Sequence, residues 1–375
     1  MLELIDGGFI GGGQTHILSL AQCIDIEHFN VVIAASAKGK FKEEVLKSNL
    51  KFNEIELPKF YMSRYLKDLN EIIVKNSIDI IHSHGGVAGM YSRFYAKKYN
   101  KAKVIHTIHG IHYINSGSSI RKIVSQSIES YLKPFTDRFI CVSEHDLITA
   151  QKMQIIVREK TSVIKNGVDL NRFKKKNRAE LLQEDFISKL NLNQEDFIIG
   201  NISRFDYQKN QKFIISNSEY FLNTFPGSKI LLCGDGKYLN ECKQMADSSR
   251  FSHRIIFTGE ITNPEKYYSL FDVFIFPSMW EGLSITLIEA MASSCCILAS
   301  DIPSNKELIE DNSTGVFFKL GDQADFRYKL LLMMEDNVLR NELSLNAESE
   351  SKKYSREKIT KKIETEYHNL LTNKL

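Results

Sequence analysis

The stretch DIIHSHGGVAGMYSRFYAKKYNKAKVIHTIH, residues 79–109, decides the fold. Two short runs rich in β-branched residues, 79–84 and 103–109, flank a segment, 86–100, whose apolar residues recur with helical spacing. A strand, a helix and a second strand joined in this way form a crossover, which places the two strands parallel in one sheet. The stretch therefore predicts an α/β fold built on a parallel sheet.

The same alternation runs along most of the chain. Other helical segments are expected over residues 14–24, 63–76 and 119–133, and residues from about 323 onward are expected to be helical only, with a last helix near 355–372. The remaining expected strands are 2–6, 30–36, 138–143 and 162–167 in the first half, and 197–203, 229–234, 254–259, 272–278, 295–300 and 315–320 in the second. A polar connector, residues 171–196, separates the two sets. Two doubly wound α/β domains are therefore predicted.

Composition restricts the function classes. The net charge of the 375 residues is only +3, which argues against a nucleic-acid partner, although residues 1–166 alone carry 22 basic and 16 acidic side chains. Glu3 and Asp6 interrupt any signal peptide, and no run of 18 uncharged apolar residues is present to span a membrane. Six scattered cysteines without a Cys-x-x-Cys pair are typical of free thiols in a reducing compartment. These features indicate a cytoplasmic protein.

A glycine-rich loop, GGFIGGGQTH at residues 7–16, follows the first strand and opens a helix near Gln14. Glycines there let an anionic ligand or a sugar approach the backbone N–H groups at the start of the helix. Gln14 and His16 lie in the first turn of that helix. The spacing is not Gly-x-Gly-x-x-Gly and no acidic residue stands out about 20 positions on, so a nicotinamide site is not expected. A flexible loop without a ligand remains the alternative.

His109 ends a strand in the sequence HTIHG, at the edge where parallel sheets bind their ligands. It is a candidate ligand contact, and a structural histidine is the alternative. Several other histidines in the first half invite a zinc interpretation: His82, His84, His106 and His112. No Cys, Asp or Glu completes a set at ligand spacing, so no metal site is expected.

The sequence SRFDYQKN, residues 203–210, follows an expected strand. Arg204 and Lys209 bring two cations to a strand–helix turn, where a guanidinium fork and an ammonium could clamp a pyrophosphate. A solvated turn is the alternative. An Asp-x-Asp pair, which would hold a metal for the same purpose, is absent from the sequence. The two cations are therefore candidates to bind a pyrophosphate without a metal.

The sequence WEGLSITLIEA, residues 280–290, is the most informative motif. Glu281 lies in a turn after an expected strand and Glu289 lies in the helix that begins near Ser284, with seven residues between the two carboxylates. A helical rise of about 7.5 Å from Ser284 to Glu289 could let one carboxylate reach a sugar and the other a ribose of the same ligand. The backbone after Glu281, at Gly282, Leu283 and Ser284, would face that ligand. Two ordinary surface glutamates are the alternative.

Taken together, the motifs resemble the family-4 retaining glycosyltransferases of the GT-B fold. The resemblance rests on the order and spacing of GGGQTH, DIIHSHGG, HTIHGIHY, CVSE, KNGVDLNRF, SRFDYQKN, CGDG, FTGEI and FPSMWEGLSITLIEAMA. It implies two Rossmann-like domains, residues 1–166 and 167–352, which face a central cleft, with residues 353–375 packing back on the first. One departure follows the second glutamate: the family pattern has Gly and often Pro there, whereas this chain reads MASSCCILAS.

The resemblance also implies roles. Arg204 and Lys209 would bind the donor pyrophosphate, Glu281 and the backbone after it the sugar hydroxyls, and Glu289 the ribose. His109 would reach the transferred sugar. The donor would be a nucleotide diphosphate sugar, most simply UDP-linked, and front-face attack would retain the anomeric configuration without cofactor or metal.

Other implied positions lie in the first domain. Gly12 and Gly13 would pack against the diphosphate and the acceptor, Gln14 and His16 would contact the acceptor, and Asn166 sits in the motif between the domains. The acceptor would be a glycan or a lipid-linked glycan of surface polysaccharide, lipopolysaccharide or capsule.

Two segments that mix aromatic with basic residues, 59–69 and 91–103, suggest peripheral contact with an anionic membrane at its inner face. Ordinary solvated helix faces are the alternative. Three other functions stay open: an epimerase on the same fold, a phosphorylase, which would need a pyridoxal lysine and a much longer chain, and an inactive sugar-nucleotide-binding scaffold.

Overall fold

The chain forms two units. The structure is a computed structural model that describes residues 1–111, 114 and 119–372. Unit 1 comprises Met1–Gly167 together with the chain from Arg356 onward, and unit 2 comprises Val168–Ser355. The expected boundaries after residues 166 and 352 lie one and three residues before these. His112 lies outside the described residues.

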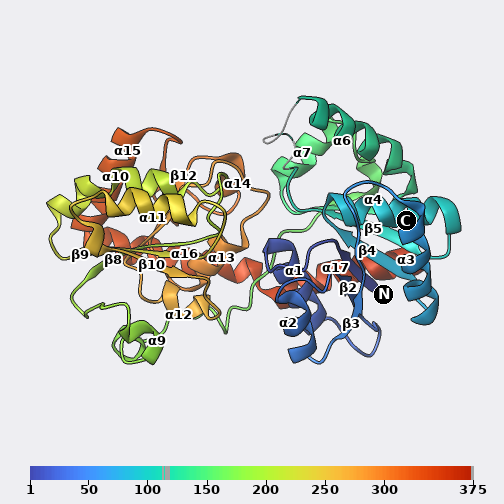
Figure 1. Cartoon of the computed structure of the whole chain (residues 1–375), viewed down its shortest axis with the longest axis horizontal. Coiled ribbons are helices and arrows are strands. Elements are labelled where there is room, and N and C mark those ends of the chain that lie inside the picture. Colours follow the sequence, from blue (N-terminus) through green and yellow to red (C-terminus); the bar gives the residue numbers. More distant parts are fainter. Residues whose placement is uncertain (112–113, 115–118, 373–375) are drawn as a thin grey trace. The chain divides into compact units, whose positions relative to one another are not determined.

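Unit 1 is built on a seven-stranded sheet in the order β3-β2-β1-β4-β5-β6-β7, with every neighbouring pair parallel (Figure 1). Its strands are β1 (Leu2–Ile5), β2 (Val32–Ala35), β3 (Lys51–Glu54), β4 (Ile80–His84), β5 (Lys103–Ile108), β6 (Arg138–Cys141) and β7 (Thr161–Val163). The strands expected in this half are confirmed. β3 was missed because its sequence, KFNE, is mostly polar, as suits an exposed edge strand.

Helices accompany this sheet along the chain. They are α1 (Gly12–Cys23), α2 (Phe41–Lys47), α3 (Ser63–Lys75), α4 (Gly86–Tyr99), α6 (Ser119–Leu132), α7 (Glu144–Lys152) and α17 (Arg356–Leu371), with short 3₁₀ turns η1 (Lys133–Phe135) and η2 (Arg158–Lys160). Figure 1 shows α17, in red, beside α1, in blue, although they lie at opposite ends of the sequence. The last helix therefore belongs to unit 1.

Unit 2 repeats the plan with a six-stranded parallel sheet in the order β10-β9-β8-β11-β12-β13. Its strands are β8 (Phe197–Ile202), β9 (Ser228–Cys233), β10 (Ile255–Gly259), β11 (Val273–Phe276), β12 (Ile297–Ser300) and β13 (Val316–Phe318). All six strands were expected. The prediction of two doubly wound α/β domains is confirmed.

The helices of unit 2 begin with two short ones in the polar connector, α8 (Arg178–Leu181) and α9 (Asp185–Ser188). The others are α10 (Gln211–Thr224), α11 (Leu239–Asp247), α12 (Pro264–Tyr268), α13 (Ile285–Ala292), α14 (Pro303–Lys306), α15 (Gln323–Glu335) and α16 (Asn337–Ser351), with 3₁₀ turns η3 (Ser252–Arg254) and η4 (Lys352–Tyr354). Among the helices that the structure describes in either unit, none has both the length and the apolar composition needed to cross a bilayer.

Apolar side chains between sheet and helices form the cores. In unit 2, one cluster joins buried strand residues such as Ile199 and Ile275 to Phe213 of α10 and Phe326 of α15. In unit 1, α17 completes a cluster of its own, in which Ile359, Ile363, Tyr367 and Leu370 pack against strand and helix residues that include Ile80 and Leu20. Since burial of apolar surface is the main stabilising term, unit 1 depends on its last helix.

The departure from the family pattern after Glu289 has a local consequence. Ser294 adopts a positive φ of 53° directly after α13, a left-handed conformation that glycine adopts with less strain. Its hydroxyl donates to the carboxylate of Glu348. The serine thus occupies a glycine-like backbone position and gains a side-chain contact to α16.

The strand order of each sheet indicates where a ligand would bind. The chain reverses its direction of winding between β1 and β4 in unit 1, and between β8 and β11 in unit 2. Ligands of open α/β sheets bind at the carboxyl ends of the strands beside such a reversal. In unit 2, the loops that follow β8 and β11 contain Arg204, Lys209, Glu281, Gly282, Leu283 and Ser284.

Candidate active site

The loop after β8 in unit 2 is organised around Asp206. Arg204, whose side chain is 69% exposed, donates to Asp206 Oδ2 from Nε at 2.8 Å and from Nη2 at 2.7 Å. The backbone N–H of Lys209 donates to Asp206 Oδ1 at 3.1 Å. One carboxylate therefore orients the guanidinium and the turn that presents Lys209. Asp206 was not singled out from the sequence, although it lies within the quoted motif.

Lys209 and Glu281 form an ion pair that joins the loops after β8 and β11. The distance from Lys209 Nζ to Glu281 Oε1 is 2.5 Å, and the two side chains are only 16% and 8% exposed. Gln208 supports the pair, since its Nε2 donates to Glu281 Oε2 at 3.1 Å and to the carbonyl of Trp280 at 2.7 Å. β8 and β11 are neighbours in the sheet, so the loops after them bring together a cation and an acid that are 72 residues apart in sequence.

The start of α13, at Ile285, lies four residues beyond Glu281. Ser284 is its N-cap and accepts a hydrogen bond from Leu287 N–H at 3.2 Å, as the expected helix start requires. Gly282 and Leu283, which precede it, are buried. Backbone N–H groups at a helix start favour an anionic or oxygen-rich ligand.

Glu289 lies further along α13 and is partly buried. Its Oε2 accepts a hydrogen bond from the hydroxyl of the buried Tyr268 at 3.0 Å. Burial raises the pKa of Glu289 to about 7, although the Tyr268 hydrogen bond and Arg172 act in the opposite direction. Tyr268 was missed because nothing near it in the sequence links it to the motif.

The glycine-rich loop of unit 1 has two kinds of glycine. A Cβ atom on Gly8 would meet the carbonyl oxygen of Lys38 at 2.0 Å, so this glycine is required by close contact between two loops. A Cβ atom on Gly12 would meet nothing within 4 Å, and one on Gly13 would meet only Ile5 at 3.0 Å. Gly12, in the first turn of α1, thus leaves open space outside the helix.

Gln14 and His16 point into unit 1. Gln14 is buried, and its Nε2 donates to the carbonyl of Gly7 at 2.9 Å, so it holds the glycine loop against α1. His16 is 5% exposed, and its ring lies 5.0 Å from that of His109. Burial, followed by the charges of neighbouring histidines, lowers the pKa of His16 to about 3. The role of both residues toward an acceptor stays a prediction.

His109 belongs to a cluster of polar side chains at the carboxyl ends of β1, β4 and β5. His84 Nδ1 lies 2.9 Å from His109 Nε2, and His84 Nε2 lies 2.6 Å from Oε2 of Glu3. Burial lowers the pKa of His84 to about 4 and that of His109 well below its usual value. Burial alone would raise the pKa of Glu3, but His82 and His84 hold it below its usual range.

Two sets of three side chains in this cluster have the proximity that a metal ion needs. The first set is His16, His84 and His109, and the second is Glu3, His82 and His84. Within each set, the potential ligand atoms lie within 4.8 Å of one another. The sequence argument against a metal missed Glu3, the acidic residue that lies near the histidines in space but about 80 positions away in the chain. Its hydrogen bond to His84 is also the kind that orients a metal-binding histidine.

Asn166 is buried at the end of unit 1, and its side chain acts to raise the pKa of His16 against the larger effect of burial. The site residues expected from the sequence therefore form two groups. Unit 1 contains Gly12, Gly13, Gln14, His16, His109 and Asn166, whereas unit 2 contains Arg204, Lys209, Glu281, Gly282, Leu283, Ser284 and Glu289.

Comparison with known families assigns most of the chain. Residues 10–172 match the sequence model of Glycosyltransferase Family 4, and residues 183–350 match that of Glycosyl transferases group 1. Each match falls almost entirely within one of the two units.

Individual relatives share about a third or less of their residues with the chain. The chain is 27% identical over 277 residues to the UDP-Gal:alpha-D-GlcNAc-diphosphoundecaprenol alpha-1,3-galactosyltransferase of Escherichia coli, a match that covers 73% of this chain and 71% of that protein. It is 31% identical over 262 residues to the alpha-monoglucosyldiacylglycerol synthase of Streptococcus pneumoniae, covering 66% and 57%. Among solved structures, that of Anabaena Alr3699/HepE in complex with UDP-glucose superposes with a TM-score of 0.86 at 18% identity, covering 98% and 99% of the two chains.

Proposed function

Because the chain belongs to the family-4, group 1 type of GT-B glycosyltransferases, we propose that it is a retaining enzyme that transfers a sugar from a UDP-linked donor to a lipid-linked glycan. The observation that carries the proposal is the Lys209–Glu281 pair at the carboxyl ends of β8 and β11. It combines a cation suited to phosphate with a carboxylate suited to sugar hydroxyls. The UDP-glucose complex of a protein with the same fold supports the choice of donor.

In this proposal Arg204 and Lys209 stabilise the leaving diphosphate. Both cations are already oriented, by Asp206 and by Glu281 respectively, so little rearrangement is needed when negative charge develops on the leaving oxygen. The N–H groups at the start of α13 add positive potential. We propose that these groups replace a metal ion and that no cofactor takes part.

The carboxylates and His109 hold the remaining parts of the donor. Glu281 accepts hydrogen bonds from the hydroxyls of the transferred sugar, and Glu289 accepts them from the ribose. His109 accepts one from a hydroxyl of the transferred sugar. The acceptor hydroxyl then attacks the anomeric carbon from the face that the diphosphate leaves, so the configuration is retained.

The names of two relatives support a lipid-linked acceptor, since one acts on a diphosphoundecaprenol-linked sugar and the other is a diacylglycerol glycoside synthase. A lipid-linked acceptor requires peripheral contact with a membrane, and the basic residues of segments 59–69 and 91–103 suit an anionic one. We propose that this contact is with the cytoplasmic leaflet, where six free cysteines are compatible with the reducing environment.

One assay tests the proposal. The chain is incubated with each of several UDP-sugars, with and without a polyprenyl-diphosphate-linked sugar, and UDP release is measured together with the anomeric NMR coupling of the product. We expect UDP release only with acceptor, and an α-glycoside from a UDP-α-sugar. Isomerisation of the donor without acceptor would identify an epimerase instead. Absence of turnover with every donor, with binding retained, would identify a scaffold.

A further inference from the structure

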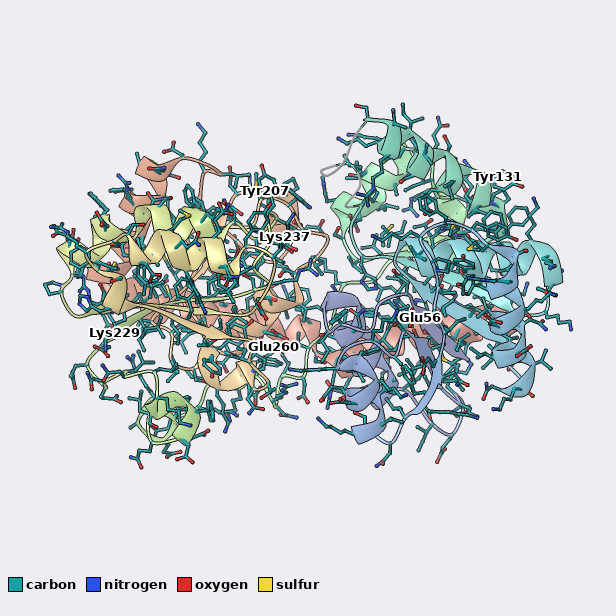
Figure 2. All side chains as sticks on the ribbon, in the orientation of Figure 1. Glu56, Tyr131, Tyr207, Lys229, Lys237 and Glu260 are labelled. Carbon is teal, nitrogen blue, oxygen red and sulfur yellow. The ribbon has the colours of Figure 1, made fainter. Side chains whose placement is uncertain are left out.

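Helix α6 in unit 1 has an unusual orientation of its side chains. Its apolar residues, apart from the buried Leu132, point to solvent: Ile120 is 74% exposed, Ile123 64% and Val124 51%. With Ile128 and Tyr131, they recur at the spacing of a single helix face, which we call the α6 stripe. Tyr131, labelled in Figure 2, lies at the rim of unit 1. An apolar face of this length turned to water marks an interaction surface.

The opposite face of α6 is polar and holds the helix in place. Both carboxylate oxygens of Glu129 accept hydrogen bonds from the fully buried Arg93 of α4, at 2.7 and 3.0 Å. Gln126 Nε2 donates to the carbonyl of Met153 at 3.0 Å. Turning the α6 stripe inward would leave a buried guanidinium without its partner, so exposure of the stripe is built into the fold.

Aromatic and basic side chains extend the surface. The ring of Tyr61 lies 4.2 Å from that of Phe94, which lies 6.4 Å from that of Tyr131. Next to Tyr61, Phe60 is 83% exposed, and Met62 is also exposed. Basic residues border these side chains in sequence or in space: Lys59, Arg64, Lys97, Arg121 and Lys122.

We propose that the α6 stripe and the loop Phe60–Met62 insert into the interface of an anionic lipid bilayer. Apolar side chains would enter the acyl boundary while the bordering lysines and arginines contact lipid phosphates, the arrangement typical of interfacial helices. The charge of the border selects a lipid surface over an uncharged protein partner. The inference rests on the proposed lipid-linked acceptor, to which it assigns the docking element.

The test measures binding, not catalysis. Wild-type chain and the double variant Ile120→Ser/Ile123→Ser are sedimented with vesicles of phosphatidylglycerol and phosphatidylcholine at physiological salt. We expect roughly tenfold weaker partitioning of the variant. The matched control, Ile26→Ser/Val338→Ser, removes two apolar side chains that are 84% and 77% exposed elsewhere and should bind like wild type. Equal binding of variant and wild type would overturn the inference, as would equal binding to pure phosphatidylcholine.

Two further measurements separate the outcomes. Sedimentation velocity without lipid shows whether the α6 stripe instead joins two copies of the chain, in which case wild type dimerises, the variant does not, and the inference fails. Transfer to a short-chain, water-soluble acceptor should be unchanged in the variant. If no transfer occurs with wild type, the proposed function is wrong whatever the binding result.

A second inference comes from the hydrogen bonds around Glu3. Its Oε1 accepts from the hydroxyl of Tyr367 in α17 at 3.0 Å, and its Oε2 lies 2.6 Å from His84 Nε2. An ionised carboxylate only accepts, so His84 carries its proton on Nε2. Neutral His84 then has a lone pair on Nδ1, and His109 Nε2, 2.9 Å away, must donate to it. Among the described residues, His109 Nδ1 has no hydrogen-bond partner, and the side chain of His109 is only partly buried.

We infer that Glu3, acting through His84, is a positioning residue that fixes His109 as the neutral Nε2–H tautomer and so presents its Nδ1 lone pair to a sugar hydroxyl. His109 would then select a ligand group that donates a hydrogen bond, not one that only accepts. This inference also rests on the proposed function, because it assigns the chemistry by which His109 recognises the transferred sugar.

Long-range ¹H–¹⁵N NMR of histidine-labelled wild-type chain tests the tautomers without any assay of activity. We expect both His84 and His109 to be neutral and protonated on Nε2 at pH 7. Protonation of His109 on Nδ1 would overturn the inference. So would one zinc ion per chain that resists chelation and depends on His84, because a metal would then replace the shared proton.

Two substitutions of His84 give a kinetic test. Asparagine reproduces the position of Nδ1 and glutamine that of Nε2, so His84→Asn keeps an acceptor for His109 whereas His84→Gln keeps only the contact with Glu3. We expect His84→Gln to raise the KM for donor about tenfold more than His84→Asn, with kcat less affected. His106→Asn, a buried histidine that instead contacts Ser83, is the matched control. Equal KM values for the two His84 variants would contradict the inference.

Discussion

The ammonium nitrogen of Lys209 lies 2.5 Å from a carboxylate oxygen of Glu281. The pair links the loops after β8 and β11, the two parallel neighbours between which the strand order of the sheet reverses. Each charge is largely withdrawn from water and each is satisfied by the other. A diphosphate that approaches Lys209 therefore meets a cation whose position is already fixed. The pair also ties the carboxylate proposed to bind the sugar to the cation proposed to bind the diphosphate, so a change in one affects both.

Replacement of Lys209 by alanine should reduce kcat about 10²- to 10³-fold, because it removes one positive charge from the leaving diphosphate. Initial rates with a UDP-sugar and a lipid-linked acceptor measure the loss. Lys212→Ala is the matched control, since Lys212 also pairs with a glutamate, Glu241, at 2.5 Å but on the surface of α10 and α11. Similar rates for the two variants would remove Lys209 from the mechanism.

Removal of divalent ions should leave turnover unchanged. In the proposed mechanism Arg204 and Lys209 carry the charge that a metal ion carries in other glycosyltransferases, so prolonged dialysis against EDTA should not lower the initial rate. The measurement compares dialysed chain with the same chain after addition of Mg²⁺ or Mn²⁺. A rate that collapses on dialysis and returns with either ion would show that the cations do not suffice.

Glu289 should make stability depend on pH. Its pKa is raised by burial from 4.5 to about 7, so between these values the unfolded chain releases a proton that the folded chain retains. The free energy of unfolding therefore falls as pH rises through this window. Glutamine does not ionise, so the free energy of unfolding of Glu289→Gln should rise relative to that of wild type by about 1–2 kcal/mol from pH 4.5 to pH 8. This value is discounted for the partial exposure of Glu289. Urea unfolding at both values measures it, with exposed Glu335→Gln as control.

Two glycines of one loop should respond differently to alanine. Gly8→Ala places a Cβ atom 2.0 Å from the carbonyl oxygen of Lys38 and should lower the melting temperature by several degrees, since the loops must separate. Gly12→Ala places it in open space and should leave the melting temperature unchanged or raise it slightly. If Gly12 clears room for substrate, the same variant should raise a substrate KM. Equal melting temperatures for the two variants would contradict the distinction.

The fold was predictable because its signals are local. Each strand of a parallel sheet buried on both faces is a short apolar run, and each crossover helix repeats its apolar positions, so both could be read without knowing the partners. β3 escaped because an edge strand need not be apolar. α13 and its cap could be placed from Ser284 because a helix start depends on neighbouring residues only.

The site was predictable only in part. Arg204, Lys209 and Glu281 lie in the loops that follow β8 and β11, and Glu289 lies in the helix that comes next, so topology explains why such positions matter. Their partners Asp206 and Tyr268 depend on distances that no sequence pattern encodes. The cluster around His109 is the clearest case: Glu3 lies 81 residues from His84 and 364 from Tyr367, and the sequence offered no reason to combine them.

The chain leaves unit 1 at Gly167 and re-enters it at Arg356, so the two parts of that unit are synthesised before and after unit 2. Unit 2 is complete before α17 has emerged from the ribosome. Until then the carboxylate of Glu3 lacks the Tyr367 hydroxyl, and the apolar cluster of Leu20 and Ile80 lacks its covering helix. Unit 1, whose first part precedes unit 2 in the chain, is therefore the last to mature, and a nascent chain stalled before residue 356 would hold a folded unit 2 and a unit 1 that still exposes this apolar cluster.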